Sequence, residues 1–187
     1  MTMLDQRTRP LLALVAASEG EPEERDGTWE HMDWQRMWLH TRSLCWRTLA
    51  LVPGDRHTPA LDVANLMVRL ALDHGERVHV ADARALRLKH VDAFLEGARY
   101  EVGQGARTIF VTMPPSTSLS AVPIAQAADC SLLCVSLGLS SLREMRATVE
   151  EIGRGRFLGS LLVTGDRGKP VRPTAPSWRP SRRKSSR

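Results

Sequence analysis

The sequence is poor in cysteine and in long hydrophobic runs. Only three of its 187 residues are cysteines, Cys45, Cys130 and Cys134, and so small and odd a number argues against a disulfide framework and fits a reducing cytoplasm. The longest apolar run near the N-terminus, residues 11–17, is far shorter than a membrane span, and acidic residues follow it closely. The sequence has no internal repeat and no Gly-x-Ser-x-Gly motif. These absences argue against a disulfide-stapled scaffold and against a serine hydrolase of the nucleophile-elbow kind.

Size and charge indicate one domain with a basic extension. A chain of 187 residues and 20.8 kDa, with 42% apolar and 25% charged residues, is ordinary for a soluble globular protein. The net charge of +5 comes from 26 basic and 21 acidic residues. Residues 167–187 hold eight of the basic residues and no acidic one, so residues 1–166 carry 18 basic against 21 acidic residues. The basic character therefore belongs to the tail and says little about the ligand of the fold.

Three segments follow from the distribution of residue types. Five acidic residues lie within 19–26, around Pro22 and just before Gly27, which predicts that residues 1–28 form a flexible, solvated acidic arm. Residues 29–166 form an α/β body. Residues 167–187 combine eight basic residues with four prolines and Trp178, which predicts a disordered basic tail. This tail is either a solubilising extension or a contact with anionic membrane or nucleic acid, and both interpretations stay open.

The body alternates between strand and helix patterns. Short apolar runs predict strands over 47–52, 77–81, 108–113, 131–137 and 157–164. Helical spacing of apolar residues predicts helices over 29–45, 60–73, 86–96, 124–129 and 140–152. The alternation predicts an α/β fold with a three-layer, doubly wound, mainly parallel sheet flanked by helices. In the first helix, Trp34, Met37 and Trp38 predict a stripe packed on the core rather than an aromatic surface for a partner.

An ordered series of motifs runs through this body. A strand ends in Pro53-Gly54, Thr58 precedes a helix that contains Asn65-Leu66, and a strand follows that ends at Asp82. The later motifs are TIFVTMPP at 108–115, ADCSLLCV at 128–135 and GSLLVTG at 159–165. In order and spacing the sequence resembles a shortened P-loop NTPase. It is most similar to the bacterial tyrosine kinases of exopolysaccharide and capsule synthesis, and more distantly to ATPases of the MinD and ParA type.

The phosphate loop of that family has lost its chemistry here. Such a loop needs small residues that let backbone N–H groups surround a phosphate, a lysine that neutralises it and a hydroxyl that holds Mg²⁺. Arg56 stands at the glycine position and His57 at the lysine position, while Thr58 keeps the hydroxyl. The resemblance therefore implies a loop that keeps its frame and loses its charge.

The acidic motifs of the family are also damaged. Asp82 matches the first carboxylate of the second motif, but Arg84 replaces the other. Thr112 stands at the aspartate position of the third motif, and a neutral hydroxyl is a poor substitute for a carboxylate as a Mg²⁺ ligand. We therefore assign no catalytic residue, no metal ligand and no cofactor. The expected vestigial nucleotide site consists of Gly54, Asp55, Arg56, His57, Thr58 and Asp82, with Thr112 as a vestigial third acidic motif.

Two further departures concern self-phosphorylation and ring formation. The kinases of this family end in a tyrosine cluster, whereas the chain has a single tyrosine, Tyr100. Their ring-forming helix carries Glu-x-x-Arg-x-x-Arg, and the matching stretch here is Asp33-x-x-Arg36-x-x-Leu39. Asp33 and Arg36 are therefore only a weak candidate for an oligomer contact.

Three hypotheses of function follow. The first is a catalytically degenerate, tyrosine-kinase-like regulator or scaffold in bacterial polysaccharide biosynthesis or export. It would be cytoplasmic or peripheral at the inner membrane, and its partner would be a polysaccharide chain-length regulator or a related kinase. The second is an active ATP-dependent kinase or ATPase with an unconventional loop, using His57, Thr58 and Asp82 with ATP and Mg²⁺. The third is a ParA- or MinD-like positioning factor that contacts DNA or membrane through its tail.

Overall fold

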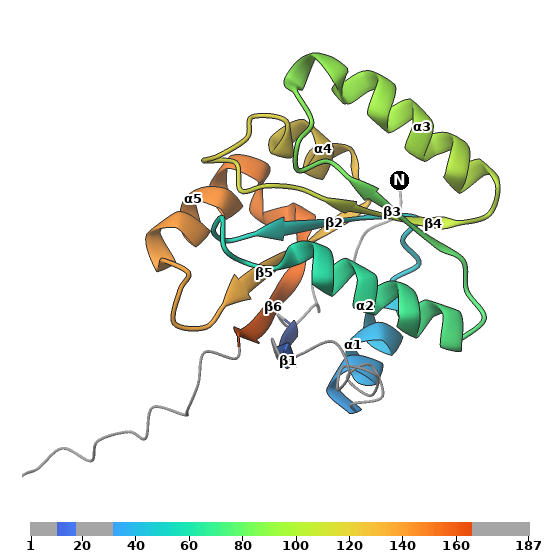
Figure 1. Ribbon diagram of the computed structural model, residues 1–187, viewed down its shortest axis with the longest axis horizontal. Helices are drawn as coiled ribbons and strands as arrows, with labels where there is room; N and C mark the ends of the chain where they lie inside the picture. Colours follow the sequence, from blue (N-terminus) through green and yellow to red (C-terminus); the bar gives the residue numbers. More distant parts are fainter. Residues whose placement is uncertain (1–10, 18–31, 166–187) are drawn as a thin grey trace, which may run out of the picture.

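Six strands form one parallel sheet in this computed structural model, which describes residues 11–17 and 32–165 (Figure 1). The strands are β1 (Leu11–Ala17), β2 (Thr48–Pro53), β3 (Val78–Asp82), β4 (Arg107–Val111), β5 (Cys130–Ser136) and β6 (Phe157–Gly165). Their order in the sheet is β1-β6-β5-β2-β4-β3, and every neighbouring pair is parallel. The predicted parallel α/β sheet is confirmed.

Helices cover both faces of this sheet. They are α1 (Met32–Ser43), α2 (Ala60–Asp73), α3 (Val91–Gly103), α4 (Ala121–Ala127) and α5 (Leu142–Ile152), with short 3₁₀ turns η2 (Leu88–His90) and η3 (Arg154–Arg156). Helices α1 and α2 lie on one face, and α3, α4 and α5 lie on the other (Figure 1). The described residues thus form the three-layer, doubly wound arrangement that the alternating pattern predicts.

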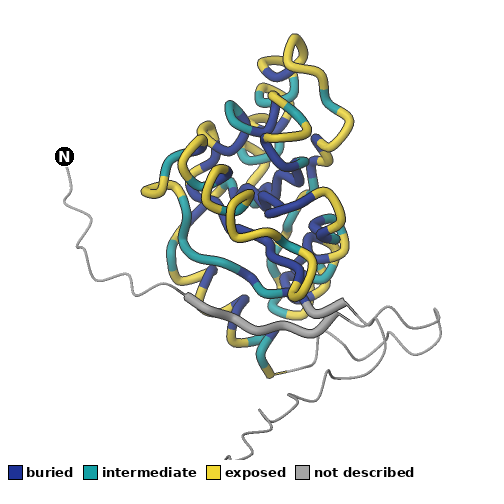
Figure 2. Tube along the Cα trace, turned by 90° about the vertical axis from the view of Figure 1, so that its left-hand side faces the viewer, coloured by how far each residue is buried: buried dark blue, intermediate teal, exposed yellow. Residues whose placement is uncertain are grey.

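Successive side chains of the central strand β2 are buried on opposite faces of the sheet. Leu49 and Leu51 belong to the apolar cluster under α1 and α2, whereas Ala50 and Val52 belong to the cluster under α3 and α4. All four residues are fully buried. A strand covered on both faces carries a continuous apolar run rather than an alternating one, which is how this strand is recognisable in the sequence. Figure 2 shows the buried residues gathered in the interior, with exposed residues on the outer helices and loops.

The tryptophans of α1 and its following turn pack in the core. Trp34 and Trp38 of α1 are at most 1% exposed, and Met37 is 2% exposed. Trp38 meets Trp46 edge to face, with ring centroids 6.3 Å apart, a favoured aromatic arrangement. The core-packing interpretation is confirmed for these residues, and they leave no aromatic surface for a partner.

Two helices differ most from their predicted bounds, whereas α1 and α5 are shorter than predicted by a few residues. The helix predicted over 86–96 is instead η2 followed by α3, which runs on to Gly103. Only Val91 and Ala98 of α3 are buried, so the apolar spacing that predicts helices is weak there. The helix predicted over 124–129 begins at Ala121, with Pro123 in its first turn. Proline is tolerated there because the first N–H groups of a helix have no intrahelical acceptor.

The N-terminal segment also differs from the expected arm. Residues 11–17, predicted as part of the flexible arm over 1–28, form β1 and pair with β6 from Leu11↔Gly159 to Ala17↔Gly165. This pairing satisfies backbone groups along the β6 edge, which would otherwise be open. The remaining arm residues and the tail over 167–187 lie outside the described residues, so their flexibility and disorder stay predictions.

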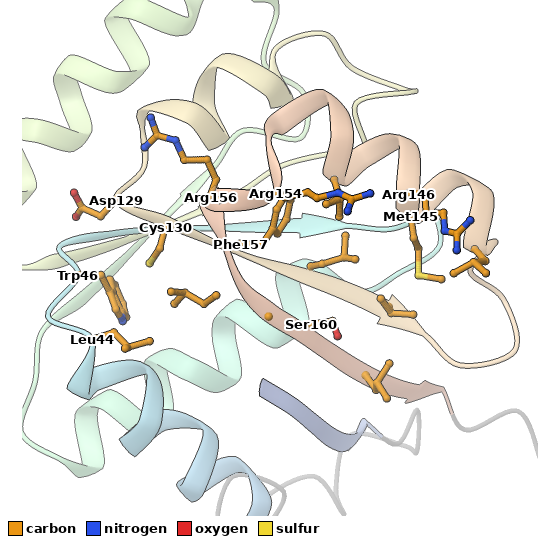
Figure 3. A pocket seen from close by; sticks show the side chains of 18 of the residues that line it. Leu44, Trp46, Asp129, Cys130, Met145, Arg146, Arg154, Arg156, Phe157 and Ser160 are labelled. Atoms are coloured by element: carbon orange, nitrogen blue, oxygen red, sulfur yellow. The ribbon is translucent and has the colours of Figure 1, made fainter. Parts of the chain in front are cut away.

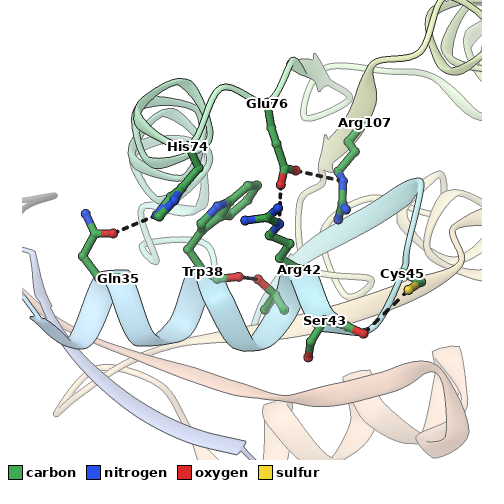
Figure 4. A network of polar contacts seen from close by, with 9 residues as sticks. Gln35, Trp38, Arg42, Ser43, Cys45, His74, Glu76 and Arg107 are labelled. Carbon is green, nitrogen blue, oxygen red and sulfur yellow. Dashed lines mark hydrogen bonds and ion pairs between the residues drawn. The ribbon is translucent and has the colours of Figure 1, made fainter.

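A carboxylate between two arginines ties α1 to the body (Figure 4). The Oε1 atom of Glu76 lies 2.5 Å from Nε of Arg42 in α1, and its Oε2 atom lies 3.1 Å from Nε of Arg107 in β4. The Arg107 guanidinium also sits 4.9 Å from the centroid of the Trp46 ring. The Glu76 side chain is only 18% exposed, so its loss would leave partly buried positive charge without its counterion.

We therefore expect Glu76→Gln to lower the free energy of unfolding by about 1–3 kcal/mol, measured by urea denaturation at neutral pH. The matched control is Glu96→Gln, because Glu96 lies exposed on α3, and its effect should stay within about 0.5 kcal/mol. Equal effects of the two substitutions would contradict a structural role for the Glu76 network.

Candidate functional site

The loop between β2 and α2 stands at the switch point of the sheet. From β2 the chain continues to β3 on one side, and it later returns to β5 on the other side of β2. In doubly wound folds the carboxyl ends of the strands at such a point form the ligand crevice. The loop is anchored there because the Gly54 N–H donates to the carbonyl oxygen of Cys134 in β5, at 2.7 Å. The sequence-predicted site residues Gly54 to Thr58 thus lie where this fold class binds ligands.

Gly54 has close neighbours on the side where a Cβ would lie. An added Cβ would stand 3.0 Å from Cγ of Met145 in α5 and 3.3 Å from the Cys134 carbonyl oxygen. Because the carbonyl belongs to a strand and cannot move easily, a larger residue would push the loop away from β5. The glycine therefore sets the close approach of the loop to β5 and α5.

Asp55 is the centre of the loop. Its Oδ1 atom accepts the His57 N–H at 2.7 Å, and its Oδ2 atom accepts the Thr58 hydroxyl at 2.8 Å and the Ser140 hydroxyl. The residue is 8% exposed. Burial raises the pKa of Asp55, but the hydrogen bonds from Ser140, Thr58 and the His57 N–H together lower it more, so this pKa stands below its ordinary value. The loop after β2 is thus folded around the carboxylate of Asp55.

Ser140 is a site residue that sequence reasoning missed. The sequence predicts Ser140 as the N-cap of the last helix, but α5 begins at Leu142 and its N-cap is Ser141. The Ser140 hydroxyl instead bonds Asp55 and accepts the Ser136 N–H at 3.0 Å. It therefore joins the loop after β5 to the loop after β2. Nothing in the local sequence distinguishes this serine from an ordinary cap, because its partner lies 85 positions away.

The remaining loop residues divide into exposed and buried groups. Arg56 and His57 are exposed, and Nε of Arg56 lies 3.0 Å from Nε2 of His57. Thr58 is buried, and its hydroxyl donates to Asp55. The hydroxyl that the resemblance links to Mg²⁺ is therefore already engaged within the loop.

Asp82, at the end of β3, is held by the arginine that replaces its neighbouring acid. Nε of Arg84 lies 3.0 Å from Oδ1 of Asp82, and NH2 of Arg84 lies 2.8 Å from Oδ2. The hydrogen bond from Arg84 is the main cause that lowers the pKa of Asp82. Both side chains are 42% exposed, so the ion pair is partly open to solvent with its charges balanced.

The other predicted residues do not join this cluster. Thr112 is buried at the end of β4, and its hydroxyl donates to the Leu51 carbonyl oxygen at 3.3 Å. Asp33 and Arg36 lie 3.9 Å apart on the outer side of α1, so an oligomer contact there stays a prediction. Cys130 and Cys134 are buried free thiols, and burial raises the pKa of each to about 12. Within residues 11–17 and 32–165 there is no group of three or more metal-binding side chains.

Comparisons with known proteins identify the fold. No protein-family model and no curated protein matches the chain. Among solved structures it is similar to the kinase domain of the Escherichia coli tyrosine kinase ETK, at 13% identity and a TM-score of 0.63 over 81% of each chain. It is similar to the chimerical protein CapA2B2, at 9% identity and a TM-score of 0.63, over 82% of this chain and 93% of that one. It is also similar to the BceF tyrosine kinase domain, at 12% identity and a TM-score of 0.55, over 73% of this chain and 76% of that one.

The chain therefore has the P-loop fold of bacterial tyrosine kinase domains, as the sequence resemblance implies. At these identities the likeness concerns the fold alone. Among the described residues, no helix has the length and apolar character that crossing a membrane requires.

The role of Asp55 generates a pH-dependent prediction. Because its pKa is lower in the folded chain than in the unfolded one, the stability it contributes is full above about pH 4 and is lost as the pH falls through the folded value. We expect Asp55→Asn to cost about 1–3 kcal/mol of unfolding free energy at pH 7, measured by urea denaturation. The difference from the parent should shrink below about pH 4.

The matched control is Asp73→Asn, because Asp73 lies exposed at the end of α2 and should change stability by at most about 0.5 kcal/mol at pH 7. A cost of Asp55→Asn that is the same at pH 3 and pH 7 would argue against a stabilising carboxylate in the loop.

Proposed function

We propose that the chain is a catalytically degenerate, tyrosine-kinase-like protein that acts as a regulatory or scaffolding partner in bacterial polysaccharide biosynthesis or export. The observation that carries this proposal is the Asp55 carboxylate inside the loop, which uses the His57 N–H and the Thr58 hydroxyl. A phosphate would have to displace this carboxylate, which has the same sign of charge. No lysine stands in the loop to offset the repulsion.

The groups that would hold Mg²⁺ do not fit the task either. Thr58 donates to Asp55, Arg84 balances the charge of Asp82, and Thr112 donates to a backbone carbonyl oxygen. An exposed ion pair such as Asp82–Arg84 is worth only about 0–1 kcal/mol, so this pair alone is a weak barrier to metal binding. The missing charges weigh more, because each lost stabilising group costs roughly 10²–10³ in the rate of such reactions.

The proposed partners are a polysaccharide chain-length regulator or a related kinase, at the cytoplasmic side of the inner membrane. A fold that keeps its frame and loses its catalytic charges is suited to binding a protein that the active relatives also bind. The contact of the tail with anionic membrane or nucleic acid stays a prediction, since residues 167–187 lie outside the described residues. The ParA- or MinD-like alternative depends on that contact.

We expect isothermal titration calorimetry to detect no binding of ATP with Mg²⁺ up to about 1 mM nucleotide, because the loop carries its own anion and lacks a lysine. The matched variant is Arg56→Gly with His57→Lys, which restores the small residue and the charge of the family's loop. It should bind ATP measurably where the parent does not.

A micromolar affinity of the parent for ATP would overturn the proposal and favour an active enzyme. In that case turnover of radiolabelled ATP should disappear in Asp82→Ala, since Asp82 is the one carboxylate kept from the family's acidic motifs.

A further inference from the structure

A large cavity runs along the α5 side of β5 and β6, and at one end it reaches the turn between α1 and β2 at Leu44, Cys45 and Trp46 (Figure 3). Its volume is about 1180 Å³, and residues 54–58 do not line it. Leu133 and Val135 of β5, with Ser160 and Leu162 of β6, contribute to its lining. Leu142, Met145 and Val149 contribute from α5. Most of these side chains are apolar, so the cavity is an apolar groove between a helix and a sheet.

The two faces of β6 differ in burial. Leu161 and Val163 belong to the cluster under α1 and α2, and each is 1% exposed. Ser160 and Leu162, on the opposite face, are only half-buried. A parallel sheet normally has helices over both of its faces. On the α5 side, the described part of the chain supplies no helix over β6, and the groove occupies that place (Figure 3).

The apolar surface continues beyond the groove at the turn between β5 and α5. Leu137, Leu139 and Leu142 are 46%, 54% and 63% exposed. Leu137 and Leu139 lie in the turn and Leu142 begins α5, so the three exposed leucines are close in the sequence. Exposed leucines that are scattered singly are ordinary on protein surfaces, whereas a group of them is not. Leu142 also lines the groove, so the turn and the groove form one apolar surface.

The charges that line the groove are mainly positive. Arg146 projects from α5, and Arg154 and Arg156 lie where β6 begins (Figure 3). Asp129 is the acidic residue of the lining. Its Oδ2 atom accepts hydrogen bonds from the backbone N–H groups of Arg47 and Thr48. Arg154 has a loose contact of 3.6 Å with Glu150, and both side chains are well exposed. The groove therefore suits an occupant with an apolar face and acidic flanks.

We propose that this groove receives an amphipathic helix of a partner protein, with its apolar face on β6 and α5 and acidic residues facing Arg146 and Arg154. The helix would complete the layer that α3, α4 and α5 begin, and its docking would follow the helix-in-groove mode. The inference rests on the proposed scaffolding function and names the surface that performs it.

Other occupants fit less well. The tail over 167–187 is a poor candidate, because its four prolines oppose a helix and its eight basic residues would face arginines. A second copy of the chain would have to offer an amphipathic helix, yet α1 and α2 bury their apolar faces in their own fold. The charge of the groove thus favours an acidic helix from another protein.

The test uses two fluorescein-labelled synthetic helical peptides of about 18 residues. The acidic peptide carries leucines at i, i+3, i+4 and i+7 with glutamates beside them, and the basic peptide has lysines in place of the glutamates. Fluorescence anisotropy with the full chain should give binding of the acidic peptide, and binding of the basic peptide that is at least about tenfold weaker. Hydrogen exchange should become slower in α5 and β6 when the acidic peptide is bound.

Charge reversal on the exposed rim separates binding from folding. Arg146→Glu combined with Arg154→Glu should reverse the preference between the two peptides, because neither side chain is part of the core. The matched control is Arg99→Glu on the outer side of α3, which should leave both affinities unchanged. A reversal cannot come from partial unfolding, since unfolding would weaken both peptides together.

Four outcomes would overturn the proposal. These are the absence of binding of the acidic peptide up to about 1 mM, equal affinity for both peptides, binding only after deletion of residues 167–187, and a dimer that Arg146→Glu dissociates. The third would show that the tail occupies the groove, and the fourth would show a second copy there. Calorimetry with ATP distinguishes the two claims, because nucleotide binding would contradict the proposed function and leave the peptide result standing.

Discussion

A parallel sheet has to be covered on both faces, and this constraint organises the whole molecule. Its strands are joined by helical crossovers, and each strand presents alternate side chains to the two sides. Where cover is complete, as over β2, four consecutive residues are fully buried. Where cover stops, as over β6 on the α5 side, neighbouring residues of one strand differ between full and partial burial. The core and the groove are two results of the same geometric requirement.

Two carboxylates at the ends of the central strand β2 stabilise the fold. Asp129 accepts the N–H groups of Arg47 and Thr48, each at 2.8 Å, where β2 begins. Asp55 accepts an N–H and two hydroxyl groups just after β2 ends. The two carboxylates hold the central strand from both ends. In a nucleotide-binding loop the corresponding donors would point at a phosphate, whereas here the His57 N–H and the Thr58 hydroxyl donate to the Asp55 carboxylate.

Sequence reasoning was accurate where the signal is local and weak where it depends on distant partners. The sequence predicts strands β2 to β6 and helix α2 within a few residues, because continuous apolar runs and a helical stripe that ends before Gly75 are visible in the chain. The bounds of α3 were missed because its outer side is mostly exposed. The strand β1 was missed because its partner β6 lies about 150 positions away. For the same reason the Ser140–Asp55 contact and the groove could not be predicted, although the loop residues themselves were.

Met145 belongs to two surfaces at once. It lines the groove, and its Cγ atom lies against the position where a Cβ of residue 54 would stand. Its thioether side chain is unbranched and adapts readily to a changed neighbour. The groove and the loop therefore share one flexible side chain as a neighbour. If an occupant of the groove shifts the conformation of the loop through Met145, the conformation of the loop shifts the affinity for that occupant by the same free energy.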